Sequence, residues 1–184
     1  VKIQEFTNLY PDSPLAYELA IALSGIDTVD KDNLILSLKA AALHHPYGYR
    51  RVSAGLRASD LISSMEGARA GADYLFNLAK TLSETDGVSK ENFPDAYSLA
   101  EVAAIRYLES ENYSLLFDVN SFIIDESPSK YTQERAGFLS AYVQELANRN
   151  YDRALESYSA LTSEASGKFW GWRAAERIKS LSKD

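Results

Sequence analysis

The two histidines of the chain are the first residues to consider as metal ligands or proton carriers, and they are adjacent, at His44 and His45. Neighbouring residues on a helix point about 100° apart, so the two rings cannot hold one ion as histidines four residues apart can. Pro46 follows them and indicates a helix end, where an imidazolium interacts favourably with the terminal carbonyls. We therefore expect a capping or surface role for the pair and no metal site.

Acidic side chains near the middle of the chain could serve as the paired carboxylates of a glycosidase. Glu109 and Glu111 are two residues apart and lie on different faces of a helix, and Asp118 lies beyond the next turn. A glycosidase acid also needs an apolar cleft, which nothing nearby indicates. No serine lies in a nucleophile elbow, and no glycine-rich loop could hold a phosphate. We expect no catalytic residue and no cofactor, and an all-helical glycan-binding or glycan-cleaving protein is the alternative function.

Charge and composition exclude further classes of protein. The 184 residues include 19 Lys and Arg, 26 Asp and Glu and no cysteine, which gives a net charge of −7 and excludes disulfides and zinc–cysteine sites. A surface for duplex nucleic acid needs excess positive charge, so we expect no nucleic-acid partner. Residues 81–130 carry ten acidic and three basic side chains. This run is either a solvated helical surface or a field that attracts a basic partner.

A small basic cluster with aromatic neighbours lies after the histidines. It consists of Arg50, Arg51 and Arg57, with Tyr47 and Tyr49 close by. Arginines interleaved with aromatic residues can bind single-stranded nucleic acid. The net charge favours the other interpretation, in which these residues pack between helices and the arginines reach to solvent.

The elements that must position these residues are helices, because apolar side chains recur at helical spacing along most of the chain. Strand-like composition is confined to Val119–Ile124. Ser13 before Pro14, and Asp30, are helix-start signals. We expect an all-α fold in a single domain, residues 1–184: a right-handed superhelical array of antiparallel helix hairpins with a C-terminal capping helix. The hairpins are expected at about 13–46, 47–83, 93–126 and 130–165, and the capping helix at 168–182.

A weak internal repeat supports the hairpin interpretation. Ala154 lies in an aromatic–small–aromatic pattern, Ala72 begins a small–aromatic–small trio, and Leu34 and Leu116 occupy the matching positions of two partial copies. These four positions are separated by 38, 44 and 38 residues. A small residue at such a position lets two helices approach closely. The longest interval contains the polar run Ser83–Asn92, which we interpret as a loop insertion.

The pattern resembles a tetratricopeptide-like helical array, most closely at Asn150–Tyr158, where an aromatic residue, Ala154 and a second aromatic residue follow one another at the spacing of that repeat. The chain is also similar to the periplasmic domain of bacterial ancillary Sec-translocon subunits and their relatives. The segments that carry this second resemblance are His45–Arg50, Asp95–Glu101, Glu134–Ala136, Asn150–Ala154 and Trp172–Arg177. The membrane-spanning helix usual in that family is absent from these 184 residues.

The resemblance implies a non-catalytic protein–protein interaction scaffold, whose partners are proteins or peptides among secretion or envelope-folding components. It implies a periplasmic location, with contact to the inner membrane only through a segment that precedes Val1; a cytoplasmic location is the alternative. The first helices of the hairpins would line a groove that receives a basic, apolar segment. The partner-binding residues predicted in this way are Arg57, Leu61, Glu101, Ile105, Glu109 and Val143.

Three large aromatic residues lie close together near the C-terminus, at Phe169, Trp170 and Trp172. Phe169 and Trp172 are predicted to close the open end of the array, together with Ile178 and Leu181. Trp170 is predicted to point elsewhere, where it either anchors a partner or supports self-association.

Overall fold

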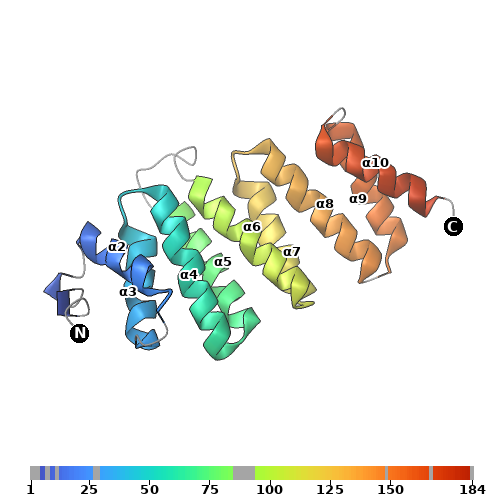
Figure 1. Cartoon of the computed structure of the whole chain (residues 1–184). Coiled ribbons are helices and arrows are strands. Elements are labelled where there is room, and N and C mark those ends of the chain that lie inside the picture. Colours follow the sequence, from blue (N-terminus) through green and yellow to red (C-terminus); the bar gives the residue numbers. More distant parts are fainter. Residues whose placement is uncertain are drawn as a thin grey trace. The chain divides into compact units, whose positions relative to one another are not determined.

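The all-α prediction is confirmed by the computed structural model, which describes residues 5–6, 9–10, 13–26, 30–84, 94–147, 149–165 and 168–182 (Figure 1). Nine helices are described and no strand occurs among these residues. The helices are α2 (Pro14–Leu23), α3 (Lys31–His44), α4 (Gly48–Glu66), α5 (Ala68–Ser83), α6 (Pro94–Glu109), α7 (Tyr113–Glu126), α8 (Lys130–Leu146), α9 (Tyr151–Glu164) and α10 (Phe169–Leu181).

Short polar residues start several of these helices. Ser13 Oγ accepts a hydrogen bond from the Leu15 N–H at 3.3 Å, and Pro14 occupies the first turn of α2. Asp30 caps α3 in the same way through the Asp32 N–H at 3.1 Å. Gly67 separates α4 from α5 with φ 100°, a conformation that other residues rarely adopt. The start signals at Ser13 and Asp30 are therefore confirmed.

Two segments singled out in the sequence have different outcomes. Val119–Ile124 is helical and lies within α7, where Val119 and Ile123 are buried one turn apart. The predicted loop insertion Ser83–Asn92 lies outside the described residues from residue 85 onward. In the part of the chain that is described, no helix combines the length and the apolar character needed to cross a membrane.

The chain divides into two compact units, Val1–Ser110 and Glu111–Asp184, and each is described by itself. In the first unit, α2, α4 and α6 form one layer and α3 and α5 the other, and each helix packs against its neighbours in sequence. Its core consists of small and large apolar side chains in alternation, among them Leu38, Ala58, Ala72, Leu75, Leu99 and Ala103.

In the second unit, α8 packs against α7, α9 and α10, and α9 packs against α10. The core of this unit is formed by Phe138, Ala141, Ala154, Tyr158, Leu161 and Ala174. Ala72 in the first unit and Ala154 here are both fully buried, as expected for small residues at positions where helices pack closely. Val143 is also buried, at 1% exposed. The prediction that Val143 contacts a partner is therefore wrong, because this face of α8 points into the core.

Candidate functional site

The predicted groove residues of the first unit lie on two helices of one layer. Arg57 and Leu61 are on α4, and Glu101, Ile105 and Glu109 are on α6, which contacts α4. Arg57 and Glu109 are exposed and the other three are half-buried. The structure therefore leaves these five residues at or near the surface of one layer.

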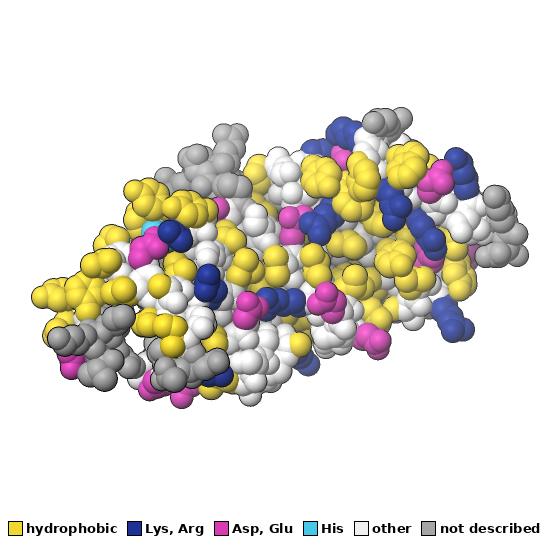
Figure 2. All heavy atoms as spheres, viewed as in Figure 1, with side chains coloured by type: hydrophobic (Ala, Val, Ile, Leu, Met, Phe, Trp, Pro, Cys, Tyr) yellow, Lys and Arg dark blue, Asp and Glu magenta, His cyan; other side chains and the backbone are white. Residues whose placement is uncertain are grey.

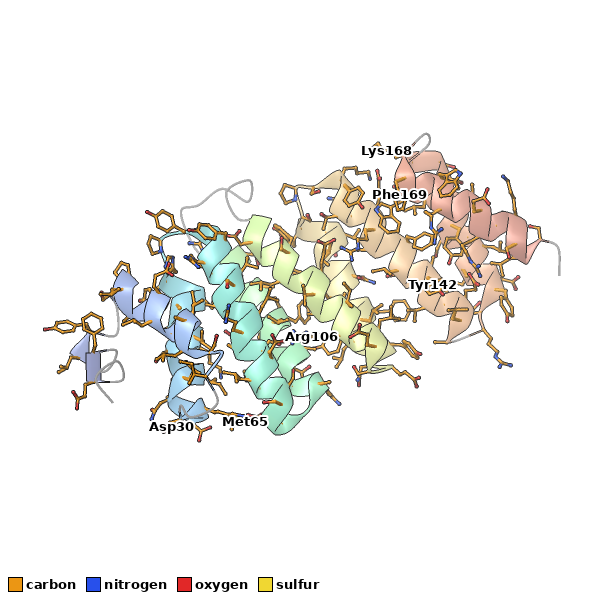
Figure 3. All side chains as sticks on the ribbon, in the orientation of Figure 1. Asp30, Met65, Arg106, Tyr142, Lys168 and Phe169 are labelled. Carbon is orange, nitrogen blue, oxygen red and sulfur yellow. The ribbon has the colours of Figure 1, made fainter. Side chains whose placement is uncertain are left out.

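A shallow pocket of about 380 Å³ lies beside Arg57. Arg57 Nη1 donates a hydrogen bond to Ser24 Oγ at 2.6 Å, which ties α4 to the residue that follows α2. Asp60 accepts a hydrogen bond from Arg106 Nη2 at 2.5 Å, and Arg106 also donates to Ser59 (Figure 3). The surface around the pocket thus carries charges of both signs. Its lining residues are Ser24, Ser53, Leu56, Arg57, Asp60 and Leu61.

In the basic cluster after the histidines, two of the three arginines form ion pairs within the protein. Arg50 Nε lies 2.9 Å from Glu18 Oε1, and Arg51 Nη2 lies 3.1 Å from Asp95 Oδ2. Because both guanidinium groups already face carboxylates, the packing interpretation of this cluster fits better than binding to single-stranded nucleic acid.

His44 and His45 point in different directions. His44 is exposed on the last turn of α3, whereas the His45 ring is 1% exposed. His45 Nδ1 accepts a hydrogen bond from the Tyr47 N–H at 3.1 Å, so the ring proton belongs on Nε2, which faces Glu18 Oε1 at 3.3 Å. His45 is the C-cap residue of α3, as the capping alternative predicts, but its ring is buried and does not lie at the surface. Among the described residues, no group of three or more His, Cys, Asp or Glu is placed to hold a metal ion.

The carboxylates considered for glycosidase chemistry are all exposed. This applies to Glu109, Glu111 and Asp118. A general acid of that kind needs an apolar cleft to hold its proton, and these side chains lie in water. No observation on the described residues favours the glycan-cleaving alternative.

In the second unit, the buried and exposed aromatic side chains of α10 are the reverse of those predicted from the sequence. Trp170 packs against Phe138, with ring centroids 5.2 Å apart, while Phe169 and Trp172 are 53% and 56% exposed. The positions of these residues around the axis of α10 explain the difference. Phe169 and Ile178 are nine residues apart and therefore lie on opposite sides of the helix, whereas Trp170 and Leu181 point in directions only about 20° apart. The buried side of α10 is therefore Trp170, Ala174, Ile178 and Leu181.

A buried ionic network fixes α10 onto the rest of the unit. Glu145 of α8 is 3% exposed and accepts hydrogen bonds from Arg177 Nε at 3.1 Å and from the Tyr158 hydroxyl at 3.0 Å. Arg177 Nη2 binds the other oxygen of the same carboxylate. Burial raises the pKa of the Tyr158 phenol above its ordinary range, so this hydroxyl remains a donor to Glu145.

The start of α10 is held at two further points. Lys168 Nζ lies 3.0 Å from Glu134 Oε1, and this glutamate is also 3% exposed. Gly171 lies so close to the end of α9 that a Cβ atom there would be 2.2 Å from the Ala165 carbonyl oxygen. Contacts at both ends of α10 therefore set its rotation about its own axis.

The rotation of α10 gathers exposed rings on one surface. Tyr131 packs on Trp170 with centroids 5.9 Å apart, Trp170 contacts Phe169 at 4.8 Å, and Phe169 contacts Trp172 at 6.4 Å. We call the three exposed members, Tyr131, Phe169 and Trp172, the aromatic face. Figure 2 shows hydrophobic side chains beside Lys and Arg over α8 and α10, and Figure 3 places Lys168 and Phe169 at the start of α10.

Comparison of the chain with family models, with curated proteins and with solved structures finds no match. The resemblance to the tetratricopeptide-like array and to the Sec-translocon subunits therefore stays a prediction.

Proposed function

We propose that this chain is a non-catalytic protein–protein interaction module, and that the aromatic face is the surface it offers to a partner. The observation that carries the proposal is the exposure of Tyr131, Phe169 and Trp172 around the packed ring of Trp170. Aromatic residues and arginine provide a large share of the binding energy in protein interfaces. A contiguous group of exposed rings is also costly to leave in water unless it is covered by a partner.

The rigidity of the aromatic face supports the same proposal. Phe169 and Trp172 lie on a helix that the Glu145–Arg177 and Glu134–Lys168 ion pairs hold at both ends. A surface that is fixed before binding loses little conformational entropy when a partner arrives.

We also propose that, within each unit, the helices stack as tetratricopeptide-like hairpins. Contacts between alternate helices, α2 with α4, α4 with α6 and α8 with α10, support this order. The repeat positions Leu34, Ala72, Leu116 and Ala154 support it as well, because each lies in the first turns of its helix and is buried. A crystal structure tests this stacking: helices within a unit that cross as a globular bundle, without layers, would contradict it.

The location and the partners of the protein are proposed from the sequence resemblance alone. We propose a periplasmic protein, tethered to the inner membrane, with partners among secretion or envelope-folding components. Cell fractionation of the complete gene product, with and without alkaline extraction of membranes, tests this part separately. Recovery in the cytosolic fraction would contradict it.

The interaction proposal is tested by peptide display. A random peptide library is selected on the full chain alone, and the enriched peptides are then measured against a Phe169→Ala/Trp172→Ala double variant, which removes only exposed rings. We expect enriched peptides that bind the wild-type chain at least tenfold more tightly than the double variant, since loss of a hot-spot aromatic costs about 2 kcal/mol or more. Peptides that bind both proteins equally would contradict the assignment.

A further inference from the structure

The charges of α8 and α10 differ in sign from those of the chain as a whole. With Lys168 included, these helices carry six Lys or Arg and three Glu, although the net charge of the chain is −7. Of the three glutamates, Glu134 and Glu145 are buried beneath their ion pairs, and only Glu176 is exposed. The charge presented to solvent by these two helices is therefore positive.

Two exposed cations border the exposed rings of α10. Lys168 precedes Phe169 and is about half exposed even while it contacts Glu134. Arg173 follows Trp172 on the same outward side of α10 and is exposed. Within the described residues, Arg173 has no carboxylate within ion-pair distance. Its guanidinium thus offers a full set of donors to an incoming group.

We infer that the partner of the aromatic face is an acidic peptide segment that carries at least one aromatic or large apolar side chain. This inference rests on the function proposed above and adds the chemistry of the partner. A carboxylate of the segment would pair with Arg173 in the two-pronged geometry that guanidinium groups favour. Its apolar side chain would pack against Phe169 and Trp172.

Other polyanions fit this surface less well than a peptide does. Nucleic acids and anionic membranes present long arrays of negative charge, which the remaining acidic surface of a chain with net charge −7 repels. A short acidic segment needs only the few residues around Arg173. The negative charge of the partner inferred here is also opposite to that of the basic partner predicted from the acidic run at residues 81–130.

The test uses the peptides enriched by the display experiment together with a charge-reversal variant. We expect the enriched sequences to have a negative net charge and to contain Phe, Tyr, Trp or Leu. Arg173→Glu should weaken their binding about ten- to a hundredfold, because it removes a charged hydrogen bond and adds repulsion. Arg153→Glu on α9 is the matched control, since Arg153 is also exposed and the change in net charge is the same.

Each outcome of this test has a distinct meaning. Enriched peptides that are neutral or basic but still need Phe169 and Trp172 would overturn the acidic partner and leave the interaction module standing. An equal loss of binding for Arg173→Glu and Arg153→Glu would also overturn it, because only net charge would then matter. Peptide binding that does not depend on Phe169 and Trp172 would overturn the proposed function itself.

Two further probes separate the competing polyanions. Fluorescence anisotropy with a 20-residue oligothymidylate, and co-sedimentation with vesicles of anionic phosphatidylglycerol, are measured at the same salt concentration as the peptide. We expect neither to bind more tightly than the enriched peptide. Tighter binding of either probe that is lost on Trp172→Ala would overturn the peptide assignment.

Discussion

Arg177 of α10 reaches across to Glu145 of α8 and engages both oxygens of a carboxylate that is almost entirely removed from solvent. The two residues are 32 positions apart in sequence. Together with the Lys168–Glu134 ion pair and the close approach of Gly171 to Ala165, their ion pair holds the rotation of α10 that exposes Phe169, Trp172 and Arg173. The stability of this pair is therefore directly linked to the presentation of the aromatic face.

Arg177→Met should destabilise the second unit by about 3 kcal/mol or more, because it leaves Glu145 buried without its cation. The measurement is urea unfolding followed by tryptophan fluorescence, which reports on this unit because both tryptophans of the chain, Trp170 and Trp172, lie in α10. Lys179→Ala, which breaks only the exposed contact with Glu176, is the control and should cost under about 0.5 kcal/mol. Equal effects would show that the buried carboxylate does not need Arg177.

Gly171→Ala should destabilise the same unit despite the higher helix propensity of alanine. The added methyl group would meet the Ala165 carbonyl oxygen at 2.2 Å, and overpacking of this kind typically costs about 1–3 kcal/mol. Gly137→Ala in α8 is the matched control, since its methyl group would meet only the end of the Leu161 side chain at 3.3 Å. We expect that variant to be neutral or more stable by up to about 1 kcal/mol. The reverse order of stabilities would contradict the close contact between α9 and α10.

Two tyrosines whose hydroxyl groups lie in the protein interior should respond differently to the loss of those groups. Tyr158→Phe removes a hydrogen bond to an ionised carboxylate and should cost about 1.5–3 kcal/mol. The Tyr74 hydroxyl is buried and has no hydrogen-bond partner in the described structure, so Tyr74→Phe should be neutral or slightly stabilising. Thermal unfolding followed by circular dichroism distinguishes the two. A clear loss of stability in Tyr74→Phe would imply a partner for that hydroxyl.

The same two tyrosines predict a loss of stability in alkali. Burial raises the pKa of both phenols in the folded chain, so the unfolded chain releases these protons first, from about pH 10 upward. The stability that these two phenols contribute is fully present below that pH and is lost as the pH rises toward their pKa values in the folded chain. Tyr74→Phe should therefore flatten the decline in unfolding free energy above pH 10. An unchanged slope would contradict the burial of this phenol.

Charge reversal on the first unit separates the two candidate surfaces. Glu101→Lys with Glu109→Lys should leave binding of the display-selected peptides within about twofold, because neither residue belongs to the aromatic face. A large loss in this variant, with no loss in Trp172→Ala, would return the binding site to the groove that the sequence had predicted on α4 and α6.

Much of the architecture follows from local sequence signals. Ser13 before Pro14, Asp30, and the small residues Ala72 and Ala154 predict where helices begin and where they pack closely, because caps and close contacts depend on one or two residues. The burial of His45 could not be predicted in this way. It depends on Tyr17 and Glu18, which belong to a different helix.

The candidate site was only partly predictable. The sequence places three large aromatic residues within four positions at the start of α10, and the spacing of these three alone does not decide which one is buried. Helical phase relative to Ala174 and Ile178 could have identified Trp170 as the inward ring. The partners that complete the choice, Phe138 and Glu145, come from α8, and no spacing within α10 reveals them.

The most direct test of the aromatic face is the pair of indole N–H signals in the nuclear magnetic resonance spectrum of the nitrogen-15-labelled chain. Trp170 and Trp172 are the two tryptophans of the chain, and assignment requires only the Trp172→Phe variant. During titration with a display-selected peptide, we expect the Trp172 signal to shift progressively and to saturate with the binding curve, while the unit stays folded. Saturating binding that leaves both indole signals unmoved would contradict the assignment of the partner site to α10.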